Sequence, residues 1–597
     1  MKGMIFLAGA AIVSSAAFGG AAANIVPQVQ SYSLTGGALP PEGYRIRIDE
    51  GGAAKIEAAD DAGRFYAAKT LEQLGPVKGP LEIEDYPVYR WRGVHLDESR
   101  HFFGKETVKK LIRTMAGFKL NVLHWHIIDD SGWRMEIPGY PEVTGKGATR
   151  RAKKGKRWLR DLADGDYGPF SYTANDIREV LKVARENFVK VVPEVEIPGH
   201  AGHLLAKCYP KFACDPEKPS GVFCLGNDEA IAFLEAVVDT VVDLFPGTYV
   251  HIGGDEVDRK VWSKCAKCRA RAKALGLKST DDLQNWVTKR FAAYLAKRGR
   301  RIVGWDEIAD GGDLPKSVVV MDWCGKGRGA KAAAAGHDIV VCHHWSNYFD
   351  YTQCVKDDPV PYPVGVPPVP VSKVYQFDPL QGIAENCRAR VLGGQCCNWT
   401  EWTCTAEELE WKLWPRACAI AENYWTAPKK KDYAEFARRL EAVRADLVKS
   451  GVNAAPIAPE DGVYLNPRPK KLKLTLGTLT VPTNVVSGAI CTFVDDKTIA
   501  DGAYEMEIHY GRGITVRASG DLGRMRAIAA LKVLARPDGE NLDKLSFSCM
   551  EIADGGAPCH AEAVKSEGFS PRRFVAAEQK SGTIGIYCDY PGREPTP

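Results

Sequence analysis

Eight short apolar segments alternate with amphipathic stretches between residues 89 and 457, and this alternation constrains the fold more than any other feature. The apolar segments have strand length, and the stretches between them repeat apolar residues every three or four positions, as helices do. Eight such β–α steps predict an α/β fold, a (β/α)8 TIM barrel. The strands are expected at 93–96, 122–127, 189–195, 249–252, 301–305, 318–321, 338–341 and 389–394. Helices are expected at 105–118, 175–187, 228–245, 283–298 and 327–335.

Polar residues gather where these strands end. In a barrel of this kind the chemistry lies at the carboxyl ends of the strands. Six strands are followed there by residues that carry chemistry: Asp97, Asp129 with Asp130, Glu194 with Glu196 and His200, Asp255 with Glu256, Asp306 with Glu307, and Trp399 with Glu401. The barrel prediction and a candidate site therefore support each other.

Two further domains are expected around the barrel at 89–457. Residues 24–88 alternate like strands at 44–48 and 54–58 and then read as a helix, which predicts a small α+β domain. A closing helix is expected at 436–447, and prolines between 456 and 469 predict a linker. Residues 458–597 form a C-terminal domain that resembles the first one, because a shift of 460 gives ten identities across the 31 positions 44–74. We interpret this tail as a degenerate α+β repeat.

The first 23 residues have the pattern of a signal peptide. Lys2 precedes the apolar stretch 4–17, and 21–23 form an A-x-A-like cleavage site before Asn24. A membrane anchor is the alternative, but the apolar stretch is too short to span a bilayer. We therefore expect an exported protein, periplasmic or secreted. The net charge of +4 is too weak to indicate a nucleic-acid partner or an anionic membrane. The oligomeric state is open.

Seventeen cysteines in an exported chain suggest disulfides. Cys208, Cys214 and Cys224 crowd one expected loop and are disulfide candidates. Cys265 and Cys268 form the only C-x-x-C pair, and zinc would need a second pair at suitable spacing, which is not obvious. A disulfide or plain thiols are therefore preferred there, and no metal or cofactor is expected.

The densest cluster is the run from His251 to Glu256. A strand ends here, two glycines permit a tight turn, and Asp255 and Glu256 follow. Both carboxylates can face one pocket only because the strand has ended. Two carboxylates in one pocket push one pKa upward, which suits a general acid beside an ionised partner. A capping pair is the alternative for such a motif in isolation.

The run resembles the H-x-G-G-D-E signature of family 20 glycoside hydrolases, the β-N-acetylhexosaminidases. The resemblance covers residues 24 to about 455. Six further motifs match in order, at 96–101, 121–130, 198–200, 304–307, 348–351 and 399–401.

The resemblance implies a retaining mechanism assisted by the substrate, whose 2-acetamido oxygen attacks the anomeric carbon and forms an oxazolinium ion. It implies that Glu256 is the acid and then the base, and that Asp255 holds the acetamide N–H. Tyr348 would orient the acetamide oxygen. Asp129 and His200 would form a relay that tunes the acid, although His200 could simply satisfy a loop.

The resemblance also implies sugar-binding residues. Trp305, Trp323 and Trp399 would wall the pocket, although tryptophans at strand ends can equally be core residues. Arg100 would bind O3 and O4. Asp350 and Glu401 would accept hydrogen bonds from O4 and O6. These contacts imply exo action on the terminal GlcNAc or GalNAc of oligosaccharides or glycoconjugates.

Two rival functions remain open. A metal-dependent hydrolase could use histidines and carboxylates at the strand ends, namely His124, His126, Glu194, His200, His251 and Asp306. A non-catalytic carbohydrate-binding protein would need the tryptophans, Arg100 and Glu401 but not Glu256.

Two features near the expected pocket depart from the family pattern. Cys324 follows Trp323, and Cys396 and Cys397 precede Asn398. These cysteines could be thiols or an unusual disulfide. Asn398 begins a formal glycosylation sequon whose position argues against modification.

Overall fold

The computed structural model describes most of the chain up to residue 457 and part of the tail. The described residues are 11–13, 27–35, 37–77, 79–154, 158–353, 366–457, 471–482, 491–498, 503–509, 513–519, 527, 536–538, 541–554, 573–578 and 584–589. The chain divides into two compact units, 1–353 with 360–457, and 354–359 with 458–597. Most of the predicted linker and most of the predicted signal peptide lie outside the described residues.

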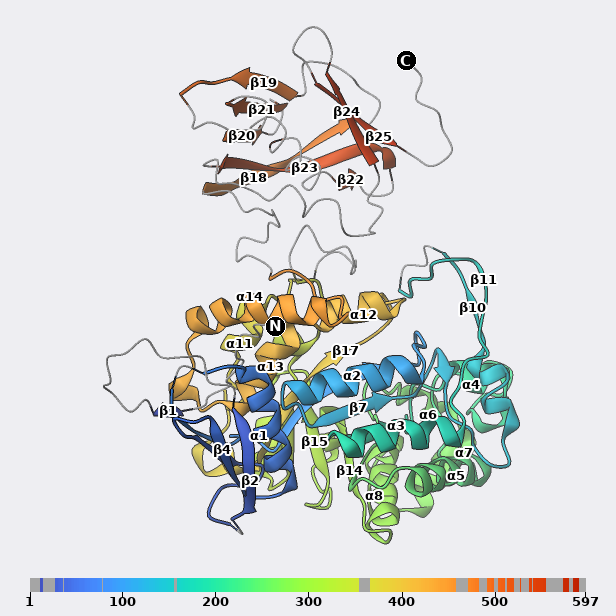
Figure 1. Ribbon diagram of the computed structural model, residues 1–597. Coiled ribbons are helices and arrows are strands. Elements are labelled where there is room, and N and C mark those ends of the chain that lie inside the picture. Colours follow the sequence, from blue (N-terminus) through green and yellow to red (C-terminus); the bar gives the residue numbers. More distant parts are fainter. Residues whose placement is uncertain are drawn as a thin grey trace. The chain divides into compact units, whose positions relative to one another are not determined.

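The N-terminal domain is a mixed sheet with one helix (Figure 1). Its strand order is β1-β5-β3-β4-β2, and α1 follows β4. Side chains alternate between buried and less buried along β3 and β4, as a half-buried strand requires. The elements are β1 (Ala11–Val13), β2 (Gln28–Leu34), β3 (Tyr44–Ile48), β4 (Ala53–Ala58), α1 (Asp61–Leu74) and β5 (Leu81–Asp85). Strand β1 lies within the stretch predicted to be a signal peptide.

A buried polar network joins this sheet to the barrel. Tyr44 Oη donates to Asp85 Oδ2 at 2.7 Å, and Lys119 Nζ lies 2.9 Å from the same oxygen. Trp425 Nε1 donates to Asp85 Oδ1 at 2.7 Å. Because each carboxylate oxygen is hydrogen-bonded, Asp85 can stay buried without an unpaired charge.

Eight parallel strands close into a barrel, as predicted. Their order around the barrel is β12-β13-β14-β15-β16-β17-β6-β7. Interior positions are filled with buried side chains, which makes the barrel a packed core. The strands are β6 (Trp91–Asp97), β7 (Val122–His126), β12 (Lys190–Glu194), β13 (Tyr249–His251), β14 (Arg301–Trp305), β15 (Val319–Asp322), β16 (Asp338–Val341) and β17 (Val391–Asn398).

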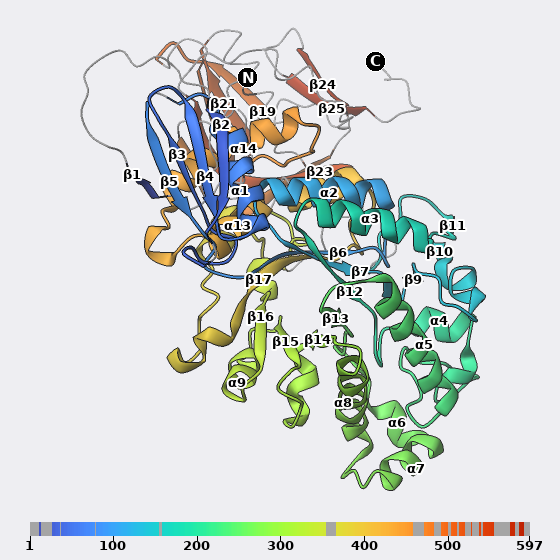
Figure 2. The same cartoon turned by 60° about the horizontal axis from the view of Figure 1, so that its bottom comes forward.

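Helices surround the strands, with one irregular step (Figure 2). The outer helices are α2 (Lys105–Gly117), α3 (Ala174–Glu186), α5 (Asp228–Leu244), α8 (Leu283–Ala296), α9 (Arg328–Ala334), α12 (Ala406–Leu413), α13 (Arg416–Trp425) and α14 (Tyr433–Lys449). Between β14 and β15, however, the chain forms only the 3₁₀ turn η5 (Asp306–Gly311). The closing helix was predicted at 436–447, and α14 contains that range.

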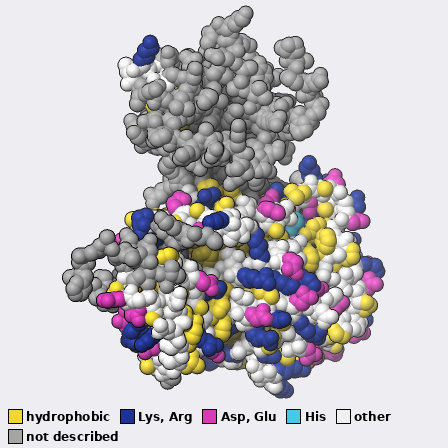
Figure 3. Space-filling model, viewed as in Figure 1, with side chains coloured by type: hydrophobic (Ala, Val, Ile, Leu, Met, Phe, Trp, Pro, Cys, Tyr) yellow, Lys and Arg dark blue, Asp and Glu magenta, His cyan; other side chains and the backbone are white. Residues whose placement is uncertain are grey.

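Short elements extend the loops at the carboxyl ends of the strands. They are β8 (Ile128–Asp129), β9 (Gly132–Trp133), β10 (Arg150–Ala152), β11 (Gly165–Tyr167), α4 (Gly202–Lys207), α6 (Lys260–Lys264), α7 (Ala266–Ala274), α10 (His344–Asn347) and α11 (Val371–Gln376). Among the described residues, no helix is long and apolar enough to cross a bilayer. Basic and acidic side chains are interspersed over the face drawn in Figure 3.

The C-terminal unit contains a sheet whose topology parallels that of the N-terminal sheet. The order β23-β20-β21-β19 repeats β5-β3-β4-β2, with the same strand directions. Tyr504 pairs with Ala518 as Tyr44 pairs with Ala58, which is the register that the shift of 460 requires. The strands of this unit are β18 (Lys471–Pro482), β19 (Cys491–Asp495), β20 (Tyr504–His509), β21 (Gly513–Ala518), β22 (Arg536–Asp538), β23 (Asn541–Asp554), β24 (Arg573–Glu578) and β25 (Ile584–Asp589). The repeat stays a prediction, supported by this shared topology.

The predicted disulfides at Cys208, Cys214 and Cys224 are absent, since all three are free thiols. Cys208 lies against the carbonyl oxygen of Glu142, 3.5 Å away. Cys214 and Cys224 approach the C-x-x-C pair instead. Sequence spacing could not reveal this, because it takes the fold to bring the two loops together.

Candidate active site

The turn after β13 places two carboxylates at the carboxyl end of the barrel. Gly253 and Gly254 have φ of 67° and 95°, a region that side chains rarely adopt. A Cβ on Gly253 would lie 1.9 Å from Glu196 Oε2, so the backbone must pass there without a side chain. Glu256 also has a positive φ of 48°. The strand has ended before Asp255, as the sequence predicted.

Asp255 and Glu256 differ in their surroundings. The Asp255 side chain is 13% exposed, and its Oδ1 is buried without a hydrogen-bond partner among the described residues. The Glu256 side chain is 65% exposed. His200 Nε2 lies between them, 3.5 Å from Asp255 Oδ2 and 3.9 Å from Glu256 Oε2. The buried Asp255 oxygen is thus free to accept a hydrogen bond from a ligand.

His200 connects this pair to two further carboxylates. Its Nδ1 lies 3.2 Å from Asp130 Oδ2 and 3.6 Å from Asp129 Oδ1. Although burial opposes its charge, Asp129 and Asp255 raise the pKa of His200 well above its ordinary value. Sequence reasoning chose Asp129 for the relay, but Asp130 is the nearer partner.

Asp129 also holds Arg100. Arg100 Nη2 lies 2.9 Å from Asp129 Oδ2 and 3.6 Å from Glu401 Oε1, and Nη1 lies 3.3 Å from Asp97 Oδ2. The guanidinium also lies over the Trp399 ring, 5.2 Å from its centroid. Three carboxylates therefore fix one cation at the pocket wall.

The predicted aromatic residues form one group. Trp305 and Trp399 have ring centroids 5.8 Å apart, and Tyr348 and Trp399 are 6.2 Å apart. Trp323 stacks on Tyr348 at 6.1 Å and 15°. Trp305 is only 1% exposed and donates a hydrogen bond to Glu194 Oε1 at 2.8 Å. It is therefore a core residue that lies against the Trp399 ring.

Asp350 and Glu401 are the two remaining residues that were predicted to bind the sugar. Asp350 is buried, and its Oδ1 has no hydrogen-bond partner among the described residues. Burial and the Glu401 charge raise the pKa of Asp350 to about 8. The structure thus holds a second buried oxygen available to a polar ligand.

A closed layer of histidines lies beneath Trp305 and Trp399. Glu194 Oε1 lies 2.9 Å from His251 Nδ1, and Glu194 Oε2 lies 3.0 Å from His124 Nε2. Burial lowers the pKa of His124 to about 3. Groups such as His124, Glu194 and His251 are close enough to hold a cation. A catalytic metal needs an open ligand position, however, and these side chains are completely buried.

Two supporting residues belong to the predicted polar clusters but were given no role in binding or cleaving the sugar. Glu307 accepts from Trp323 Nε1 at 3.0 Å, and burial together with Asp255 raises its pKa to about 8. Asp306, a ligand in the rival metal reading, accepts from Cys324 N at 3.1 Å. Their position directly after β14 is the sequence feature that could have indicated their place in the site.

The cysteines near the pocket are buried free thiols: Cys324, Cys396 and Cys397. Asn398 is also completely buried, which leaves its sequon inaccessible to glycosylation.

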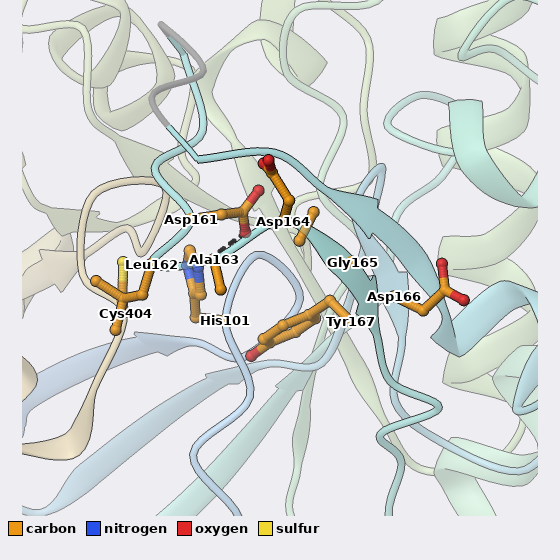
Figure 4. A pocket seen from close by; sticks show the side chains of 10 residues that line it. His101, Asp161, Leu162, Ala163, Asp164, Gly165, Asp166, Tyr167 and Cys404 are labelled. Carbon is orange, nitrogen blue, oxygen red and sulfur yellow. Dashed lines mark ion pairs between the residues drawn. The ribbon is translucent and has the colours of Figure 1, made fainter.

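A cavity of about 210 Å³ lies beside the site, lined by His101, Asp161, Tyr167 and Cys404 among others (Figure 4). Asp161 Oδ1 lies 2.7 Å from Arg150 Nη1 and 3.7 Å from His101 Nε2. None of the predicted site residues lines this cavity. It is therefore separate from Asp255 and Glu256.

Two family models match the chain. The glycosyl hydrolase family 20 catalytic domain matches residues 89–428, and domain 2 of the same family matches residues 9–86. The chain belongs to glycosyl hydrolase family 20. The eight barrel strands, and the strands and helix of the preceding α+β domain, fall within the matched ranges.

Relatives in this family carry consistent names. A beta-hexosaminidase of Porphyromonas gingivalis is 37% identical over 71% of this chain and 56% of its own length. One from Vibrio furnissii is 32% identical over 65% of this chain and 66% of its own length. A solved exo beta-N-acetylglucosaminidase of Vibrio harveyi, in complex with N-acetylglucosamine, is 30% identical with a TM-score of 0.65, covering 72% of this chain and 69% of that chain. The family 20 chain thus spans less than two thirds of the first two relatives.

Proposed function

We propose that this chain is an exo-acting, retaining β-N-acetylhexosaminidase that removes terminal GlcNAc or GalNAc from oligosaccharides or glycoconjugates. The observation that carries the proposal is the pair at the end of β13: Asp255 keeps a buried oxygen unpaired while Glu256 points toward solvent. The beta-hexosaminidase names of the P. gingivalis and V. furnissii relatives support it.

Asp255 is the residue that holds the substrate's acetamide. Its Oδ1 accepts the acetamide N–H, and its negative charge stabilises the positive oxazolinium that forms when the acetamide oxygen attacks C1. His200 lies 3.5 Å from its other oxygen and fixes the carboxylate. Tyr348, stacked on Trp323, donates to the acetamide oxygen and directs it toward C1.

Glu256 moves the proton. It protonates the leaving oxygen as the glycosidic bond breaks, and then takes a proton from the water that opens the oxazolinium. Its side chain is 65% exposed, which leaves the carboxyl group accessible to the leaving oxygen and to water. His200, with Asp129 and Asp130, tunes this acid.

Arg100, Asp350 and Glu401 bind the hydroxyls of the terminal sugar. Arg100 donates to O3 and O4, while Asp350 and Glu401 accept from O4 and O6. Trp399, under the Arg100 guanidinium, is available to stack on the sugar. A ring held on all its hydroxyls leaves no space for a chain continuing beyond O4, which makes the enzyme exo-acting.

A panel of aryl β-GlcNAc, β-GalNAc and lacto-N-biose substrates at several pH values tests this function. We expect release of the aryl group from at least one terminal N-acetylhexosaminide, with retained configuration in the sugar product. The Glu256→Gln variant should still bind GlcNAc but release no aryl group. Wild-type protein that binds GlcNAc without turnover would identify a carbohydrate-binding protein instead. Activity abolished by EDTA at an unchanged Tm would favour the metal-dependent hydrolase.

We also propose that the protein is exported. The support is the pattern of residues 1–23, with Lys2 before an apolar stretch and an A-x-A-like site. N-terminal sequencing of protein recovered from a bacterial periplasm or medium should begin at Asn24. Full-length protein that remains in the cytosol would contradict this proposal.

A further inference from the structure

Four cysteine side chains from two loops meet in the unit that contains the barrel. Cys214 and Cys224 lie between β12 and α5, and Cys265 and Cys268 lie between β13 and α8. Their four Sγ atoms all lie within 4.8 Å of one another. Cys214–Cys268 and Cys224–Cys265 are separated by 3.7 Å, and Cys224–Cys268 by 3.6 Å.

These separations fit a shared metal ion better than they fit disulfides. A disulfide joins its sulfurs at about 2.05 Å, and all four cysteines are free thiols. A tetrahedral zinc ion with Zn–S bonds of about 2.3 Å spaces its sulfurs by about 3.8 Å. We propose that Cys214, Cys224, Cys265 and Cys268 bind one structural zinc ion. The sequence favoured a disulfide or plain thiols at Cys265 and Cys268, because no second cysteine pair at zinc-site spacing was obvious.

The backbone around the thiols is built to hold them together. An antiparallel bridge pairs Ala213 with Phe223, directly before Cys214 and Cys224. Gly226 packs against the C-x-x-C loop so closely that a Cβ there would lie 2.4 Å from Cys268 N. Side-chain bulk at residue 226 would therefore separate the two cysteine pairs.

The cluster lies at the N-terminal end of a helix. Cys265 is the N-cap of α7, and Cys268 lies in its first turn, where the helix dipole stabilises negative charge. Cys224, Cys265 and Cys268 are buried, and Cys214 is half-buried. Binding converts four thiols and Zn²⁺ into a tetrathiolate complex of net charge −2 and releases four protons. The basic residues along α7 offset part of that charge.

The zinc would anchor the two loops that carry the catalytic residues. The chain that holds Cys214 and Cys224 leaves β12 through His200, and the chain that holds Cys265 leaves β13 through Asp255 and Glu256. A direct hydrogen bond from Trp262 Nε1 to Phe223 O, at 3.0 Å, already joins these loops near the cysteines. Four protein ligands leave no open position, so the ion's role is structural and the catalytic chemistry does not use it.

Metal analysis of the purified full-length protein, produced in zinc-supplemented medium without a metal-affinity tag, tests the proposal. We expect elemental mass spectrometry to find about one zinc ion per chain. Cys268→Ser should lose that zinc. The matched control Cys418→Ser removes another buried thiol, on α13 outside the cluster, and should keep it.

A second measurement on the wild type keeps the test decisive if Cys268→Ser does not fold. After denaturation with EDTA and without reductant, all four cysteines should react with an alkylating agent, as peptide mapping can show. Replacing zinc with cobalt should give the visible absorption of a tetrahedral tetrathiolate site. Zinc-free wild-type protein, another metal at that stoichiometry, or a disulfide between any two of the four would overturn the assignment. Because every readout is independent of turnover, failure here is distinguishable from failure of the proposed glycosidase function.

Discussion

The loops after β12 and β13 are used in two contrasting ways. Near the strands they carry His200, Asp255 and Glu256. There Asp255 Oδ1 is buried without a hydrogen-bond partner among the described residues, and the Glu256 side chain is 65% exposed. Farther along they carry four cysteines whose sulfurs face one another. An active site keeps hydrogen-bonding capacity for a ligand, whereas a structural site satisfies its groups internally. The comparison predicts that substitutions near the strands lower kcat, whereas substitutions of the four cysteines lower the free energy of unfolding.

Replacing Glu256 with Gln should have the largest effect on rate. An amide cannot donate the proton that the leaving oxygen needs, so kcat should fall by about 10³-fold or more. The exposed side chain contributes little to packing, so the Tm should stay within about 1 °C. Kinetics on an aryl β-GlcNAc with a parallel melting curve checks both. A large fall in Tm would break the contrast between the two regions.

Replacing Asp255 with Asn should lower kcat by about 10² to 10³-fold. The amide removes the negative charge that faces the developing oxazolinium, while the side-chain volume is kept. The loss should appear mainly in kcat rather than in KM, because the charge on the substrate develops in the transition state. Equal activity of the variant and the wild type would remove Asp255 from the mechanism.

Replacing Cys224 with Ser should show the opposite pattern. We expect about 3 kcal/mol lower free energy of unfolding, because one ligand of the proposed zinc is lost. At a temperature where the variant is still folded, kcat/KM should fall less than about tenfold. Cys208→Ser is the matched control, since Cys208 lies in the same loop but outside the cluster. Equal denaturation midpoints for both variants would contradict the contrast.

The smallest expected effect is the contribution of His200 to the pH dependence of the free energy of unfolding. Its pKa is raised in the folded state, so the protonated form stabilises the fold below the unfolded value of about 6.5. That stabilisation is lost as the pH rises through the folded pKa. The difference in unfolding free energy between wild type and His200→Gln should therefore shrink from pH 6 upward. A difference that grows with pH would show that His200 is neutral in the folded protein.

The sequence predicted all eight barrel strands because strands buried on both faces are continuous apolar runs. It also predicted the cluster at Asp255 and Glu256, since a strand end followed by two glycines is a local pattern. It assigned Asp129 to the relay with His200, although Asp130 is nearer, because chain spacing does not show which of two adjacent side chains faces a residue on another loop. It missed the cysteine cluster, because that cluster depends on how distant segments pack.

The central claim is that the substrate's own acetamide performs the displacement, and the dependence of rate on that group tests it most directly. Wild-type kcat/KM should be measured on matched aryl β-N-acetylglucosaminide and aryl β-glucoside substrates. We predict a preference of about 10³-fold or more for the N-acetylated sugar, and this preference should collapse in Asp255→Asn. Comparable rates on the two sugars, or a covalent glycosyl adduct trapped on the protein, would contradict the account.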